Sequence, residues 1–208
     1  MWKINNNMKN KAKYFSNALD QRVILNINDC IDYVDAMSRE IYLNSLTPAA
    51  ADQIEKTIRF WNNIDDAETP LIADRKPINI YIDSFGGSLG AAFTIVDIIK
   101  NSKTPVYTIN IGVCQKEALY PYLAGHKRYA YPRSSFYLDK NIDRLDLSEG
   151  QSNYEDFIKK QAFELKDMVL EATKITETDY DNRKGWWLTA DKASELKICQ
   201  EVLRNKII

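Results

Sequence analysis

Alternating and helically spaced hydrophobic positions predict an α/β domain that begins near residue 39. Strands are expected where apolar and polar residues alternate, and helices where apolar residues recur every three or four positions. The predicted strands are 39–43, 78–82, 106–111, 128–131, 135–138 and a closing strand near 198–203. The predicted helices follow residue 47, span 89–100, 115–124 and 152–173, and follow residue 189. The order strand, helix, strand favours a parallel sheet covered by helices.

Local signals mark where some of these elements begin and end. Thr47 is a suitable helix cap, and Pro48 in the first turn does no harm because the N–H that it lacks has no partner there. Thr189 is expected to cap the last helix in the same way. Gly112 follows the predicted strand 106–111, so we expect a turn at this glycine.

The first 38 residues differ from the rest of the chain. They are polar, rich in Asn and Lys, and contain only one short apolar stretch, 23–27. Such a segment is too polar to form a hydrophobic core of its own. We therefore predict an N-terminal arm, 1–38, followed by a single domain, 39–208, which is an ordinary size for one core.

Charge and cysteine content narrow the classes of partner and compartment. The 28 basic and 29 acidic residues leave a net charge of −1, so nothing favours nucleic acid or an anionic membrane surface. Cys30, Cys114 and Cys199 are odd in number and far apart, which favours buried, reduced thiols over disulfides or a metal site. No apolar run approaches the roughly 20 residues of a membrane helix. A cytoplasmic protein without metal or cofactor is expected.

A glycine pair lies between the strand 78–82 and the helix 89–100, in the turn Asp83-Ser84-Phe85-Gly86-Gly87-Ser88. Amides at such a place can point at an oxyanion or a phosphate. Taken alone the pair is a weak signal, because glycines after a strand more often serve only to turn the chain.

The whole stretch resembles a strand and oxyanion loop of the Clp protease proteolytic subunit, ClpP, whose usual sequence is YINSPGGS. Further segments resemble motifs of that family in the same order along the chain. They are 108–112 (TICIG in the family), 123–125 (AAG), 127–132 (KRYALP) and 187–190 (FLSA). The resemblance implies a ClpP/crotonase-like fold, a stack of ββα units with a protruding handle helix, here 152–173. It also implies heptameric rings that stack in pairs.

The resemblance places the family's catalytic serine and histidine on other residue types. The segment 112–117 matches the family's GQAASM and has Lys116 at the serine, while 133–139 matches NSRVMIH and ends in Asp139. Counting back from 187–190 puts the family's aspartate on Asp181. The oxyanion loop would comprise Gly86, Gly87 and Glu117. A serine peptidase needs a hydroxyl, a base and a carboxylate, so the triad chemistry is predicted to be absent.

The opposite charges at these positions suggest that an ion pair replaces the catalytic triad. We expect Lys116 to form a structural ion pair with Asp139 or Asp181, because a buried lysine without a partner would be costly. Cys114 is the only other nucleophile nearby, and no histidine lies within reach of it. His126, the only histidine, is expected to be a surface-turn residue.

Three functions follow from this pattern. The first is a catalytically inactive ClpP homologue, a pseudoprotease that acts as a ring-forming structural or regulatory subunit. It would assemble with itself, as a tetradecamer, or with an active ClpP paralogue or a Clp ATPase. The second is an active ATP-dependent Clp-type serine endopeptidase. The third is a crotonase-like acyl-CoA enzyme that uses the carboxylates of Glu117, Asp139 and Asp181.

Overall fold

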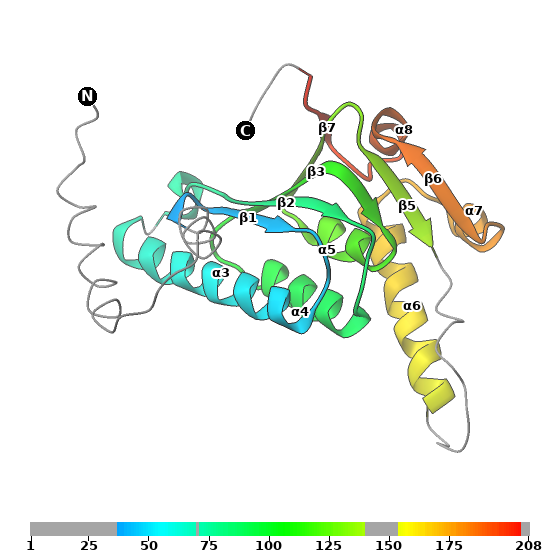
Figure 1. Ribbon diagram of the computed structural model, residues 1–208, viewed down its shortest axis with the longest axis horizontal. Coiled ribbons are helices and arrows are strands. Elements are labelled where there is room, and N and C mark those ends of the chain that lie inside the picture. The colour runs from blue at the N-terminus through cyan, green and yellow to red at the C-terminus, as the bar shows by residue number, and fades with distance from the viewer. Residues whose placement is uncertain (1–36, 70, 140–153, 205–208) are drawn as a thin grey trace, which may run out of the picture. The chain divides into compact units, whose positions relative to one another are not determined.

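A seven-stranded sheet forms the centre of the computed structural model, which describes residues 37–69, 71–139 and 154–204. Five strands follow one another in the order β1-β2-β3-β4-β7, while β5 pairs with β3 and β6 pairs with β5 (Figure 1). All pairs are parallel except β5 with β6. The strands are β1 Glu40–Leu43, β2 Ile78–Ser84, β3 Val106–Gln115, β4 Lys127–Ala130, β5 Ser135–Asp139, β6 Gly185–Thr189 and β7 Glu201–Val202.

Helices cover the sheet, and three of them lie along the same side of β1 to β3 (Figure 1). Among these three, α4 packs against both α3 and α5. The long helix α6 packs against α5 and extends away from the sheet (Figure 1). The helices are α3 Pro48–Glu68, α4 Leu89–Lys100, α5 Leu119–Ala124, α6 Tyr154–Ala172, α7 Glu177–Asp181 and α8 Ala190–Glu195, with short 3-10 turns η1 Ile72–Asp74 and η2 Lys116–Ala118.

The apolar periodicity of the sequence explains which side of each element is buried. Ile54, Ile58 and Trp61 of α3 are buried together, and Thr47 caps this helix by accepting a hydrogen bond from the amide of Ala50 at 3.1 Å. Thr189 caps α8 in the same way, through the amide of Lys192. Both cap predictions are confirmed.

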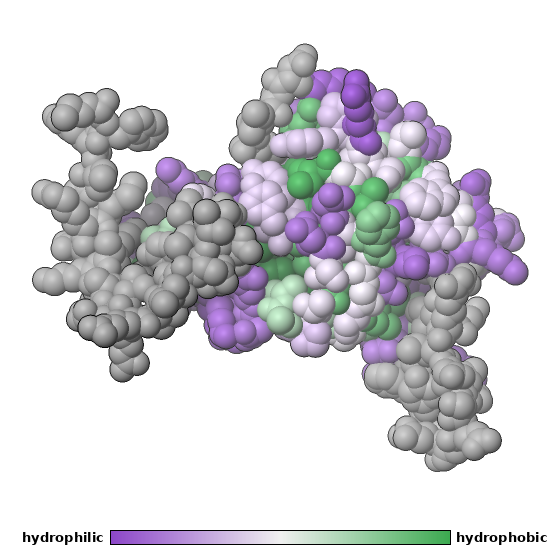
Figure 2. All heavy atoms as spheres, viewed as in Figure 1, coloured by the Kyte–Doolittle hydropathy of each residue, from purple (hydrophilic) through white to green (hydrophobic). Residues whose placement is uncertain are grey.

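The opposite face of the sheet carries a separate, smaller apolar cluster. Tyr81, Ile109 and Leu203 are its buried members, and tyrosines 107, 129 and 131 with Ile111 pack around them. The surface in Figure 2 shows apolar residues in separate patches among hydrophilic ones. Within the part of the chain that the structure describes, no helix is long and apolar enough to cross a bilayer.

The structure differs from the sequence prediction at several boundaries. The strand predicted to end before Gly112 continues to Gln115, so the turn predicted at this glycine is wrong. The helix predicted to begin at 115 begins as η2 and becomes α-helical only at Leu119. Strand β6 and helix α7 were not predicted. Cys114 and Cys199 are buried free thiols as expected, whereas Cys30 and the N-terminal arm up to residue 36 lie outside the described residues.

Candidate functional site

A bulge in β3 brings the candidate site together. Ile82 of β2 is opposite Asn110, but Ser84 is opposite Cys114, so β3 contains two extra residues between these pairs. Gly112 lies within the bulge, and the Asp83 carboxylate accepts a hydrogen bond from the amide of Val113 at 2.9 Å. Bulges bend a strand and often occur next to functional sites. The glycine is needed because a Cβ at position 112 would collide with the Asp83 carboxylate.

The bend lets β3 change partners along its length. Before the bulge β3 pairs with β4, and after it residues 113–115 pair with 135–137 of β5. The side chain of Asn110 fixes the branch, since its Nδ2 donates to the carbonyl of Ser135 at 2.8 Å and its Oδ1 accepts from Gly112 at 3.2 Å. As a result β3 and β5 end near each other, so that Lys116, which follows β3, and Asp139, which ends β5, lie at the same edge of the sheet.

Lys116 occupies the turn between β3 and the helices that follow. Its φ of 51° lies in the left-handed region, which is unusual for a residue other than glycine and is often found at functional sites. The side chain is only half-buried. Among the described residues, no carboxylate oxygen lies within 4.0 Å of its ammonium group. The predicted ion pair of Lys116 with Asp139 or Asp181 is therefore wrong, and the half-buried position removes the reason to expect one.

The glycine loop between β2 and α4 lies directly against this turn. Gly86 and Gly87 have φ values of 105° and 151°, which favour glycine. The amide of Gly86 donates to Ser84 Oγ at 3.2 Å, and that of Ser88 donates to the carbonyl of Leu46 at 2.9 Å. The amide of Gly87 donates to Glu117 Oε2 at 3.1 Å. The amides of Gly86, Gly87 and Ser88 are therefore all hydrogen-bonded within the chain.

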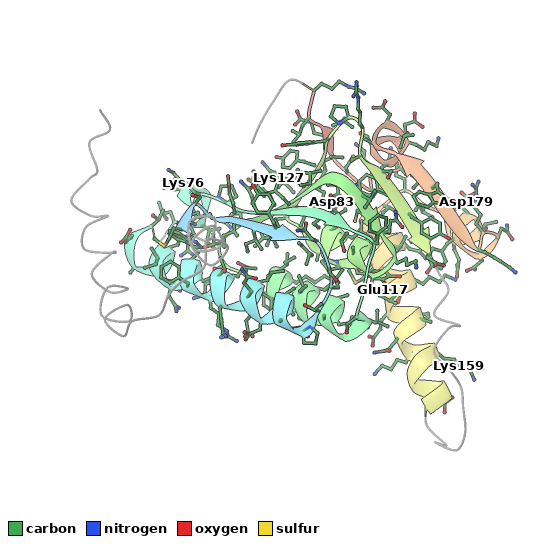
Figure 3. The ribbon with its side chains drawn as sticks, in the orientation of Figure 1. Lys76, Asp83, Glu117, Lys127, Lys159 and Asp179 are labelled. Atoms are coloured by element: carbon green, nitrogen blue, oxygen red, sulfur yellow. The ribbon has the colours of Figure 1, made fainter. Side chains whose placement is uncertain are left out.

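Two carboxylates of the site lie near one phenol. Tyr120, on α5, is buried, and burial is the main cause that raises its pKa, with further contributions from the charges of Tyr180, Glu117 and Asp139. Glu117 and Asp139 are therefore both close enough to Tyr120 to act electrostatically on its hydroxyl. Figure 3 labels Glu117 and Asp83 at the end of the sheet where β2 and β3 meet their helices.

Asp181, at the end of α7, is held by a different lysine from the one expected. Lys166 of α6 donates to Asp181 at 3.0 Å and to Glu177 at 2.8 Å. The hydrogen bonds that Lys166 donates to the carboxylates of Glu177 and Asp181 raise its pKa. This contact ties α6 to α7. Sequence reasoning missed Lys166, because a lysine beside the apolar stripe of a helix carries no signal of its partner.

The remaining candidates are structural residues. Cys114 is fully buried, and burial raises the pKa of its thiol, which is the opposite of what a nucleophile needs. His126 is exposed in the turn before β4, as predicted, and its Nδ1 accepts a hydrogen bond from the amide of Val106 at 3.1 Å. Among the described residues, no three His, Cys, Asp or Glu side chains gather in a way that could hold a metal ion.

Comparison with known proteins assigns the family. The family model described as Clp protease matches residues 67–206, so the chain belongs to the Clp protease family. The chain is 32% identical over 137 residues to the ATP-dependent Clp protease proteolytic subunit 2 of Treponema denticola, which covers 63% of this chain and 68% of that protein. A protein of the same name from Borreliella burgdorferi is 27% identical over 137 residues, 64% of this chain and 69% of that protein.

A solved structure supports the fold. A ClpP1 mutant from Listeria monocytogenes superposes with a TM-score of 0.69, covering 85% of this chain and 97% of that chain at 20% identity. The predicted α/β, ClpP-like fold with a parallel sheet is therefore confirmed. The assignment of Lys116, Asp139 and Asp181 to the family's catalytic positions stays a prediction, as does that of Gly86, Gly87 and Glu117 to the oxyanion loop.

Proposed function

We propose that this chain is a catalytically inactive subunit of the Clp protease type, which contributes to a ring assembly without hydrolysing peptides itself. Family membership supports the first part of the proposal. The second part depends on the site, where a lysine occupies the turn after β3 and an aspartate ends β5. A charged ammonium cannot attack a peptide carbonyl, and a carboxylate that ends β5 has no hydroxyl to activate there.

One observation carries the proposal: the amide of Gly87 already donates to the Glu117 carboxylate. A serine-type site stabilises its tetrahedral intermediate through donors that are free to meet the developing oxyanion. The site therefore lacks a hydroxyl nucleophile at position 116, an imidazole base at position 139 and a free Gly87 donor.

The test is a peptidase assay on the purified full-length protein, at its native assembly state. The substrates are casein and a fluorogenic peptide, with and without a Clp ATPase, and an active Clp proteolytic subunit serves as the control. We expect no turnover above the buffer rate and no labelling by a fluorophosphonate probe. Labelling at a serine, or turnover that co-elutes with the chain, would support the alternative of an active endopeptidase and would refute the proposal.

Assembly is tested separately by native mass spectrometry and by co-purification. Seven copies of the 24.0 kDa chain correspond to about 168 kDa, and two stacked rings to twice that mass. We expect a ring of this chain or a mixed ring with an active Clp subunit, and a monomer under both conditions would contradict the structural role. No contact in the described site favours the crotonase-like alternative, and saturable binding of an acyl-CoA would be the result that supports it.

A further inference from the structure

We propose that Glu117 is a built-in lock that holds the glycine loop shut. Its carboxylate occupies the amide of Gly87, so that an external carbonyl oxygen or carboxylate cannot use this donor. The inference deepens the proposed function and rests on it, because it names the contact that would keep the corner of the site closed.

The amides on either side of Gly87 are engaged as well. Gly86 donates to Ser84 Oγ and Ser88 donates to Leu46, so both neighbours of Gly87 are engaged within the chain. Leu46 also forms a parallel bridge with Gly87, and its amide donates to the carbonyl of Gly86 at 3.2 Å. The loop is therefore anchored from the β1 side, and Glu117 is the group that covers it from the β3 side.

Position 86 has the space that the lock requires. A Cβ at Gly86 would collide with Glu117 Oε2 and would lie 3.2 Å from Lys116 Cβ. The carboxylate can thus reach the amide of Gly87 only because residue 86 lacks a side chain. Glu117 belongs to η2, whose position is set by the bend of β3, so the lock and the bend are parts of one arrangement.

A tethered carboxylate is a strong competitor for the amide. The hydrogen bond has a charged acceptor, which makes it stronger than one to a neutral oxygen. An external anion must also overcome the high effective concentration of a group that is fixed next to the donor. We therefore expect the amide to be closed to external carboxylates in the native chain and open to them once the side chain at 117 is removed.

The chain offers a selective probe of this single amide. It contains seven glycines, and Gly86-Gly87 is the only pair of adjacent glycines. The protein is labelled with glycine that carries ¹³C at the carbonyl and ¹⁵N at the amide. Only the nitrogen of Gly87 is then bonded to a labelled carbonyl carbon, so a carbonyl-filtered experiment selects its amide signal alone. The readouts are its hydrogen-exchange rate and its shift during titration with sodium acetate at constant ionic strength.

The variants are Glu117→Ala, the conservative Glu117→Gln, and Glu195→Ala as a matched control on an exposed glutamate. In Glu117→Ala we expect the Gly87 amide to exchange about tenfold faster, because it has lost a charge-assisted hydrogen bond. We also expect its signal to shift saturably with acetate. In Glu117→Gln the exchange rate of the Gly87 amide should lie between those of the native chain and of Glu117→Ala, because glutamine keeps an oxygen acceptor and loses the charge. The native chain and Glu195→Ala should show slow exchange and no response to acetate.

Three results would overturn the lock. They are fast Gly87 exchange in the native chain, exchange that Glu117→Ala leaves unchanged, and fast exchange in that variant without any response to acetate. The signals of Gly125 and Gly185 in a ¹⁵N-glycine spectrum report whether each variant is folded. If Glu117→Ala does not fold, Glu117→Gln still tests the lock. None of these readouts depends on peptide hydrolysis, so the lock and the proposed function can fail separately.

Discussion

Replacement of Arg128 by methionine is expected to destabilise the domain more than any surface substitution. Arg128, on β4, donates to the carbonyl of Ile198 at 2.8 Å, to that of Ala172 at 2.9 Å and to that of Lys197 at 3.0 Å. It thereby fastens the end of α6 and the segment before β7 to β4. None of these three acceptors is a carboxylate, and burial lowers the pKa of the guanidinium.

The magnitude follows from the three carbonyls within 3.0 Å that would lose a charged donor; a fourth, that of Leu123, is 3.5 Å away and contributes little. Hydrogen bonds to charged groups contribute roughly 1.5–3 kcal/mol each, and relief of the buried charge offsets part of their loss. We expect Arg128→Met to lower the free energy of unfolding by about 3–4 kcal/mol. For a chain of this length the loss corresponds to a Tm roughly 10 °C lower.

The assay is thermal unfolding followed by circular dichroism at a fixed protein concentration, since assembly makes the Tm depend on concentration. Arg59→Met is the control, because Arg59 is exposed and, among the described residues, pairs with Glu55 one turn away on α3. Its Tm should remain close to that of the native chain. If Arg128→Met unfolds within about 2 °C of the Arg59 variant, the three carbonyls do not need the guanidinium and the reasoning is refuted.

Three further predictions concern pH, local stability and reactivity. Burial opposes ionisation of Asp65, but hydrogen bonds from Arg39 prevail and lower the pKa of this carboxyl below its usual value of 3.8. The stabilisation is therefore present above pH 3.8 and is lost as the pH falls through the lowered pKa. In urea titrations, the free energy of unfolding should fall more steeply with acid in the native chain than in Asp65→Asn. Lys166→Met should speed hydrogen exchange in 176–182 while the Tm changes little, because the pair with Asp181 is partly exposed; unchanged exchange would exclude the tie. Burial raises the pKa of Cys114, so iodoacetamide should modify it in urea and not in the native chain.

The elements that could be predicted depend on nearby residues. The Thr47 cap needs only Ala50 three residues later, and the strand 78–82 shows its alternation within five residues. Fold class followed from the order of such elements together with the ordered motifs of the family. These signals are local, and tertiary contacts agree with them.

The missed features depend on residues far apart in the chain. Gly112 resembles a turn glycine, but the carboxylate of Asp83, 29 positions earlier, takes up the amide exposed by the bulge and lets β3 continue. The ion pair of Lys116 was predicted from opposite charges at positions that the family resemblance brings together, whereas Asp181 is paired with Lys166 of α6. Charge in a sequence indicates that a partner is needed and does not identify it.

The contact between Glu117 and Gly87 has a consequence for how such a site could change over generations. Under the proposed function, a serine introduced at position 116 alone would meet a loop amide that is already engaged and a β5 that ends in Asp139. If the proposal holds, hydrolysis would need changes at positions 116, 117 and 139 together. Selection acts on single steps, so a return to catalysis would have to cross intermediates without benefit, and loss of activity in this lineage would be effectively one-way.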